Sequence, residues 1–124
     1  MTSPQMKESQ RAVQLWSLLV LAARSQQLLS YTTVHRSTGI ATVGIGGCLG
    51  PILHYCRKQR PPLPWLTALV VNEENGTPGP AFMEAAKREY GDAFDLHAMQ
   101  ARVFVYDWLK LDVPSTEDFE AALL

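Results

Sequence analysis

Cys48, His54 and Cys56 carry the most versatile side-chain chemistry in this 124-residue chain. Their spacing matches no structural zinc pattern, and no fourth ligand is evident. A cysteine nucleophile is an alternative, because its histidine base need not be close in sequence, but nothing in the pattern favours one. The two cysteines are better explained as small buried apolar side chains. We therefore expect no catalytic residue, no metal ion and no cofactor.

The spacing of the cysteines also predicts a compartment. Eight residues apart on one helix, their Cα atoms would be separated by about 12 Å, which no disulfide spans. Two reduced thiols are typical of the cytoplasm, and we expect a cytoplasmic location. The apolar run at residues 12–23 is interrupted by Gln14 and Ser17. It is also shorter than the roughly 20 residues that span a bilayer, so no membrane partner is expected.

Glycines are unusually dense in GIGGCLGP, residues 44–51, where the surrounding pattern predicts a helix. The stretch is neither a P-loop nor a dinucleotide fingerprint, because no Lys-Ser/Thr pair follows it and no parallel-sheet pattern surrounds it. Gly44, Gly46 and Gly47 therefore indicate close approach of a second body. Close packing against the first helix is the favoured interpretation, and approach of a nucleic-acid backbone is the alternative. A glycine at 47 would also relieve the clash that Pro51 makes one turn back.

Charge is divided unevenly along the chain. Residues 1–72 carry a net charge of +6 and residues 73–124 a net charge of −7, which leaves −1 overall. Such a split indicates either a surface that faces a polyanion or an acidic element lying against a basic one. For the first possibility, the residues able to contact DNA phosphates are Thr32, Thr33, Arg36, Ser37, Thr42, Arg57, Lys58 and Arg60. The last three could instead interact with the dipole at the end of their own helix.

These residues need a scaffold, and the pattern predicts one. A first helix is expected over 8–28, where apolar residues recur every three or four positions. Ser30 can cap a short helix over 31–37, Gly39 supplies a turn, and a second helix is expected over 42–58. Residues 65–72 and 80–83 are expected to form a β-hairpin, or wing. The segment 30–82 would then be a winged helix-turn-helix.

The remaining segment, 83–124, predicts acidic C-terminal helices. A helix over 83–90 would end at Gly91, and Asp95 can cap another over 95–108. Ser115 and Asp118 resemble a capping box for a last short helix. Apolar groups on more than one face of the helix over 95–108 would suit a protein partner or a homodimer. We expect one domain over 1–124, mainly α with a small β-hairpin.

Four stretches resemble a known family: SYTTVHRSTGI (30–40), GIGGCLG (44–50), PPLPWLTALVVN (61–72) and GTPG (76–79). They are similar to the DNA-binding domain of alkylguanine-DNA alkyltransferases and alkyltransferase-like proteins. In that family a tyrosine begins the short helix, a helix rich in small residues enters the minor groove, and a proline-rich loop leads to the active-site strand. The Pro-Cys-His-Arg motif of that strand corresponds here to Leu66, Thr67, Ala68 and Leu69. The family's arginine finger falls near Val43 or Gly44.

The resemblance therefore implies DNA binding without alkyl transfer, because the nucleophile, its histidine and the arginine are all replaced. Our leading hypothesis is a non-catalytic DNA-binding module that acts as a regulator or accessory factor. The alternative is a protein-protein interaction module on the same scaffold, with the acidic C-terminal helices as the contact surface. An enzyme ranks third.

Overall fold

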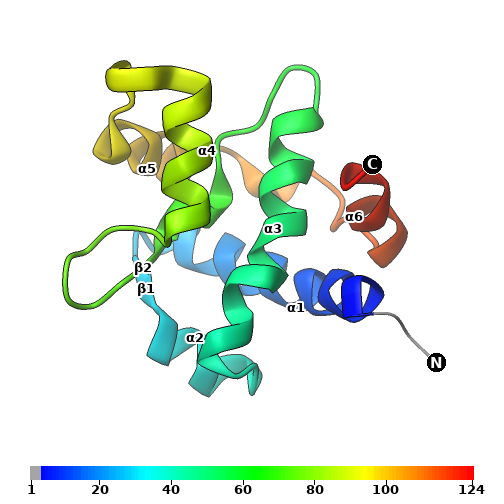
Figure 1. The fold of residues 1–124 in the computed structure, drawn as a ribbon. Helices are drawn as coiled ribbons and strands as arrows, with labels where there is room; N and C mark the ends of the chain where they lie inside the picture. The colour runs from blue at the N-terminus through cyan, green and yellow to red at the C-terminus, as the bar shows by residue number, and fades with distance from the viewer. Residues whose placement is uncertain (1–3) are drawn as a thin grey trace.

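The computed structural model describes residues 4–124, with side chains from Glu8 onward. Residues 1–3 of the expected domain lie outside the described part. The described chain is mainly helical, with six α-helices and one two-stranded sheet (Figure 1). The elements are α1 (Pro4–Arg24), β1 (Leu29–Ser30), α2 (Tyr31–Thr38), α3 (Thr42–Lys58), the 3-10 helix η1 (Leu66–Leu69), β2 (Val70–Val71), α4 (Pro80–Tyr90), η2 (Gly91–Ala93), α5 (Leu96–Val105), η3 (Trp108–Lys110) and α6 (Thr116–Ala122).

Helix α1 is the central element, and α3 and α6 both pack against it. Its buried stripe includes Leu15, Trp16 and Leu19, each at most 2% exposed, as the three- and four-residue spacing predicted. The helix ends at Arg24, four residues before the predicted end. Gln26 takes a positive φ of 54°, which no helix continues, and the chain turns there toward β1.

The pair α2–α3 follows the prediction closely. Ser30 caps α2 by accepting a hydrogen bond from the Thr33 backbone N–H, and Gly39 ends it in a left-handed conformation with φ 76°. Ile40 is buried beyond the turn. Helix α3 spans the predicted residues and runs through Pro51. The two helices are bent by 89° relative to each other, so the segment after the turn leaves in a nearly perpendicular direction.

The predicted wing is wrong. Residues 66–69 form the 3-10 helix η1. Within the predicted strand 65–72, only Val70 and Val71 form a strand, and they pair in parallel with Leu29 and Ser30 of β1. Pro80 begins α4 instead of an edge strand, because its fixed φ suits the first turn of a helix. Among residues 4–124 there is no antiparallel hairpin, and the winged helix-turn-helix class is not confirmed.

The C-terminal helices close the core. Asp95 caps α5, and the capping box of Ser115 and Asp118 is present at α6. Helix α5 stops at Val105, three residues before the predicted end, and the chain continues into η3. Phe119 of α6 packs with Trp16 and Tyr55, which ties α6 to both α1 and α3. The acidic segment is therefore an integral part of the fold.

Candidate nucleic-acid interface

One side of α3 is open along the length of the helix. Its residues are largely exposed, and three of the five are glycines; we call this set the glycine face, and it consists of Val43, Gly46, Gly47, Gly50 and His54. They recur at steps of three and four, so they share one side of the helix. Val43 is 96% exposed, which is unusual for a large apolar side chain. The opposite side, including Ile45 and Ile52, is buried in the core.

The space around each glycine of α3 shows whether a neighbouring part of the chain packs closely against it. A Cβ built on Gly46 or Gly50 would meet nothing within 4 Å, and one on Gly44 would make ordinary contact with Ile40. Only at Gly47 would a Cβ meet a neighbour closely, the Glu8 carboxylate of α1, 2.5 Å away. Close packing against the first helix is therefore wrong for Gly46, and at Gly47 the only close neighbour is the movable end of the Glu8 side chain. The glycines leave the α3 backbone accessible from outside.

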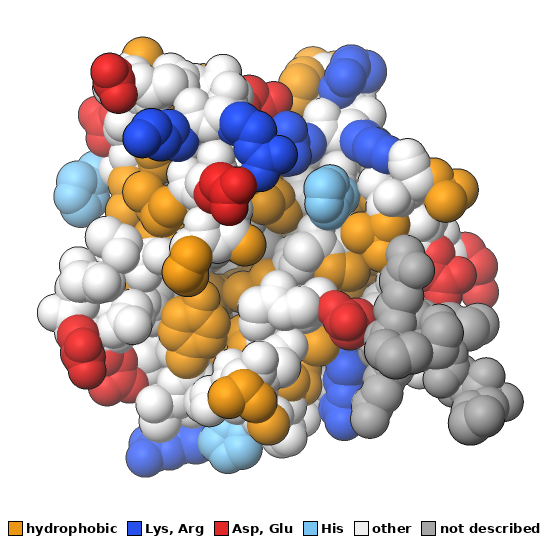
Figure 2. Space-filling model, viewed as in Figure 1, with side chains coloured by type: hydrophobic (Ala, Val, Ile, Leu, Met, Phe, Trp, Pro, Cys, Tyr) orange, Lys and Arg blue, Asp and Glu red, His pale blue; other side chains and the backbone are white. Residues whose placement is uncertain are grey.

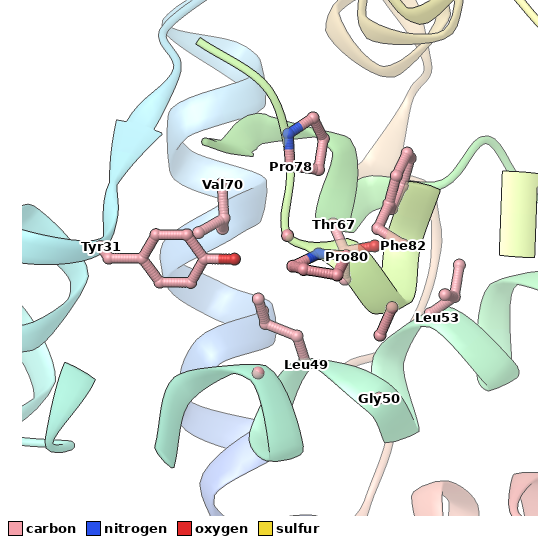
Figure 3. A pocket seen from close by; sticks show the side chains of 12 residues that line it. Tyr31, Leu49, Gly50, Leu53, Thr67, Val70, Pro78, Pro80 and Phe82 are labelled. Carbon is pink, nitrogen blue, oxygen red and sulfur yellow. The ribbon is translucent and has the colours of Figure 1, made fainter. Parts of the chain in front are cut away.

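A cavity of about 120 Å³ adjoins this face, between α3, the start of α2 and the start of α4 (Figure 3). Its wall is mostly apolar, and its polar groups are two hydroxyls and exposed backbone. The lining residues are Tyr31, Gly46, Leu49, Gly50, Leu53, Thr67, Val70, Pro78, Gly79, Pro80, Ala81 and Phe82. Gly46 and Gly50 belong both to this cavity and to the glycine face, so the two form one continuous surface.

Thr67 contributes an unsatisfied hydroxyl to the cavity. The residue is 3% exposed, and its Oγ1 has no hydrogen-bond partner. A buried hydroxyl without a partner costs free energy, about 1–3 kcal/mol in mutational data, and native proteins contain few of them. The cavity therefore holds a hydrogen-bonding group that no part of the described chain satisfies.

Tyr31 lies across the cavity from this threonine, with its ring directed at the loop before α4 (Figure 3). The pKa of the Tyr31 phenol is raised, mainly because the phenol is partly buried. A hydrogen bond with the Gly79 backbone offsets part of that rise. The phenol oxygen would be 2.6 Å from a Cβ on Gly79. A Cβ at position 79 would force the phenol to shift, so glycine permits this close approach, and the contact joins α2 to the loop that leads into α4.

The predicted phosphate contacts fall into two groups. Thr32, Thr33, Arg36, Ser37 and Thr42 are exposed on α2 and at the start of α3. Arg57, Lys58 and Arg60 lie at the other end of α3, about 24 Å away at 1.5 Å per residue. The structure does not bring the eight residues together. It places one group at each end of the glycine face.

The basic group is partly engaged within the fold. Arg57 Nε is 3.4 Å from Glu89 Oε2, without the geometry of a hydrogen bond, and its guanidinium lies over the Trp65 ring. Lys58 Nζ donates to the Leu124 carbonyl, and Arg60 donates to the carbonyls of Arg57 and Gln59. Both Lys58 and Arg60 stay exposed. Figure 2 shows Lys and Arg side chains gathered where α3 and α4 end, above a hollow lined by hydrophobic side chains.

Neither cysteine forms a disulfide, and both are buried, as expected. Burial raises the pKa of the Cys56 thiol to about 12, which disfavours the thiolate that nucleophilic chemistry requires. His54 is exposed on the glycine face. In residues 4–124, no group of three or more His, Cys, Asp or Glu side chains is arranged to hold a metal ion.

No single helix of the described chain has the length and apolarity to cross a membrane; only α2 and α3 taken together pass that test, and they are bent by 89°. The chain was compared with protein-family models, with curated proteins and with solved structures. None of the three comparisons finds a match.

Sequence reasoning missed the cavity and the parts that Thr67 and Gly79 play in it, and it considered His54 only as a metal ligand or a base. One signal was available for Thr67, because it carries the one hydroxyl in the apolar run WLTALVV. Gly79 was noted only as the end of the GTPG stretch, and its close contact with Tyr31 joins residues 48 positions apart, which spacing does not reveal.

Proposed function

We propose that this chain is a non-catalytic DNA-binding module that lays the glycine face of α3 against the sugar–phosphate backbone of DNA. The observation that carries the proposal is the open space at Gly46 and Gly50. Glycine in a helix interior costs roughly 0.5–1 kcal/mol relative to alanine. No intramolecular contact at these two positions offsets that cost, so a ligand that must approach the backbone closely is the favoured explanation.

Charge supports a nucleic acid as that ligand. The face has hydroxyl groups and Arg36 at one end and the exposed Lys58 and Arg60 at the other. Hydroxyls, lysines and arginines are the usual partners of phosphate oxygens, and such contacts position a protein on DNA. The right-angled pair α2–α3 further resembles a helix-turn-helix in which α3 is the recognition helix.

The cavity beside the face suggests where an unstacked base would go. Proteins hold a base that has left the duplex by hydrogen bonds to its edge and by contact with apolar or aromatic side chains. Thr67 offers an unused hydroxyl, and Tyr31, Leu49 and Phe82 offer ring and aliphatic surface. No nucleophilic cysteine is available there, so the module would hold a base without reacting with it.

The test is a fluorescence-anisotropy titration of a labelled duplex at increasing salt concentration. Affinity should fall linearly on a log–log plot, with a slope set by the number of phosphates neutralised. Replacing Arg57, Lys58 and Arg60 by alanine should flatten the slope. No binding at low salt would refute the proposal.

The cavity has its own test, a duplex with one unpaired base compared with a fully paired one. The parent should prefer the unpaired base, and Thr67→Val should reduce the preference while leaving affinity for paired DNA unchanged. Valine keeps the volume of threonine and removes only its hydroxyl. Equal affinity of the parent for both duplexes would confine the interaction to the glycine face.

A further inference from the structure

A second hollow adjoins the glycine face on the side of α1. It has a volume of about 510 Å³ and lies between the N-terminal part of α1, the turn after α2 and the first turns of α3. We call it the α1 cleft. Val43 and Gly47 of the glycine face line it, whereas Gly46 and Gly50 of the same face line the cavity that contains Thr67. The glycine face therefore lies between two hollows.

The α1 cleft holds a carboxylate beside the glycine face. Glu8 of α1 lines the cleft, and one of its carboxylate oxygens would be 2.5 Å from a Cβ on Gly47. No cation of residues 8–124 lies within ion-pair distance of this carboxylate. Glu8 is also the one acidic residue in the sequence 1–72, where seven Lys and Arg residues give the net charge of +6. A negative charge thus stands within the surface proposed to meet phosphates.

A carboxylate at this place favours a part of DNA other than its backbone. Phosphate oxygens are negatively charged acceptors, so their approach to Glu8 is repulsive. An ionised carboxylate only accepts hydrogen bonds, and the donors that DNA offers are the exocyclic amino groups at the base edges. Cytosine N4 is such a donor in the major groove, and guanine N2 is one in the minor groove. Adenine N6 suits a carboxylate less well, because the acceptor N7 stands beside it.

We propose that Glu8 is a specificity-determining residue that accepts a hydrogen bond from an exocyclic amino group of a G·C pair; this inference rests on the DNA-binding function proposed above. Gly46, Gly47 and Gly50 share one side of α3, so a strand laid over Gly46 and Gly50 runs beside the Glu8 carboxylate. Phosphate contacts position a protein on DNA, whereas contacts with base edges select the sequence. Arg11 lines the same cleft, and its positive charge offsets the repulsion between Glu8 and the nearest phosphates.

The test compares two labelled duplexes of equal length at one salt concentration, one made of A·T pairs alone and one with G·C pairs at its centre. The parent should bind the G·C duplex about tenfold more tightly, within the range that one base contact provides. Glu8→Ala should lose this preference and bind the A·T duplex more tightly than the parent does, because the repulsion of phosphates is removed. Asp92→Ala is the matched control, since it removes the same charge at an exposed position of η2 outside the α1 cleft and should keep the preference.

A third duplex, with inosine in place of guanine, identifies the donor. Inosine lacks the N2 amino group of guanine and leaves cytosine N4 in place. A preference that disappears with inosine would assign the contact to guanine N2 in the minor groove, and one that persists would assign it to cytosine N4 in the major groove.

The outcomes separate this inference from the function on which it rests. Equal affinity of the parent for the A·T and G·C duplexes, or a preference that Glu8→Ala retains, would overturn the role of Glu8 and leave DNA binding in place. Failure to bind either duplex at low salt would overturn the DNA-binding function itself, and the role of Glu8 with it.

Discussion

The two halves of α3 differ in what they leave available. The N-terminal half has no charged side chain, and Gly46 and Gly50 there have open space around them. In the C-terminal half the cations are dense, but Arg57 is held by Glu89 and Trp65, and Lys58 by a backbone carbonyl. Backbone access and positive charge are thus separated along one helix. On the proposed function, close approach would come from the first half and long-range attraction from the second.

The largest expected effect on DNA affinity comes from a substitution that fills the open space beside the N-terminal half of α3. Gly50→Glu places a carboxylate where the structure has empty space beside the cavity. DNA affinity should fall about a hundredfold, because bulk and like charge both oppose approach of the backbone. The matched control is Ala101→Glu, which adds the same charge at an exposed position of α5. Similar losses for the two variants in anisotropy titrations would attribute the effect to net charge alone.

Two glycine-to-alanine changes should move stability in opposite directions. Gly39→Ala should destabilise the fold by about 1–2 kcal/mol, since its φ of 76° strains a residue that carries a Cβ. Gly46→Ala should stabilise it by about 0.5–1 kcal/mol, since alanine is the better helix former and its Cβ meets nothing. Urea denaturation measures both. A loss of stability for Gly46→Ala would revive the packing interpretation.

In the basic C-terminal half of α3, we expect Arg57 to stabilise the fold and Lys58 to bind DNA. Arg57→Ala removes the contacts with Glu89 and Trp65 and should cost about 1 kcal/mol of stability. Lys58→Ala should leave stability nearly unchanged and reduce the salt slope of DNA binding by about 0.9, the contribution of one phosphate. The opposite assignment in parallel denaturation and salt titrations would place the binding charge on Arg57.

A smaller effect should follow from pH. Partial desolvation of the exposed His54 ring, then the charges of Arg57 and Lys58, lower its pKa below the ordinary value, so the ring is mainly neutral at pH 7. DNA phosphates favour the protonated ring, and affinity should therefore rise as pH falls from 7 toward the depressed pKa. Anisotropy at several pH values should show this rise in the parent and lose it in His54→Gln. An unchanged profile in the variant would remove His54 from the interface.

The same histidine has the opposite effect on folding. The His54 ring binds a proton more readily in the unfolded chain than in the folded protein. The free energy of unfolding should therefore decline as pH falls below about 6.5. His54→Gln should reduce that decline, which distinguishes a folding effect from a binding effect.

The sequence predicts helices where local rules decide them. Ser30, Gly39 and the Ser115–Asp118 pair act on neighbouring backbone groups, and α2, α3 and α6 lie close to where these residues predict them. The run 65–71 misled because every residue in it is buried, and a buried 3-10 helix and a buried strand share a composition. The parallel pairing of Leu29 with Val70 joins residues far apart in sequence, which a two-residue strand cannot signal.

The candidate site was predictable only in part. The density of glycine marked α3, but whether a neighbour fills the space beside Gly46 depends on the folded arrangement. The unsatisfied hydroxyl of Thr67 is likewise a property of its surroundings. Charge counting found Arg57 and did not reveal Glu89 as its partner, because the ion pair joins α3 to α4 across 32 positions.

The most direct test of the central claim is a paired measurement on Gly46→Leu. Leucine is a good helix former and would project into open space, so the free energy of unfolding should stay equal to that of the parent or rise. DNA affinity should fall more than about tenfold, because the side chain holds the α3 backbone away from the phosphates. A stable variant that binds DNA as tightly as the parent would contradict the claim that the glycine face is the interface.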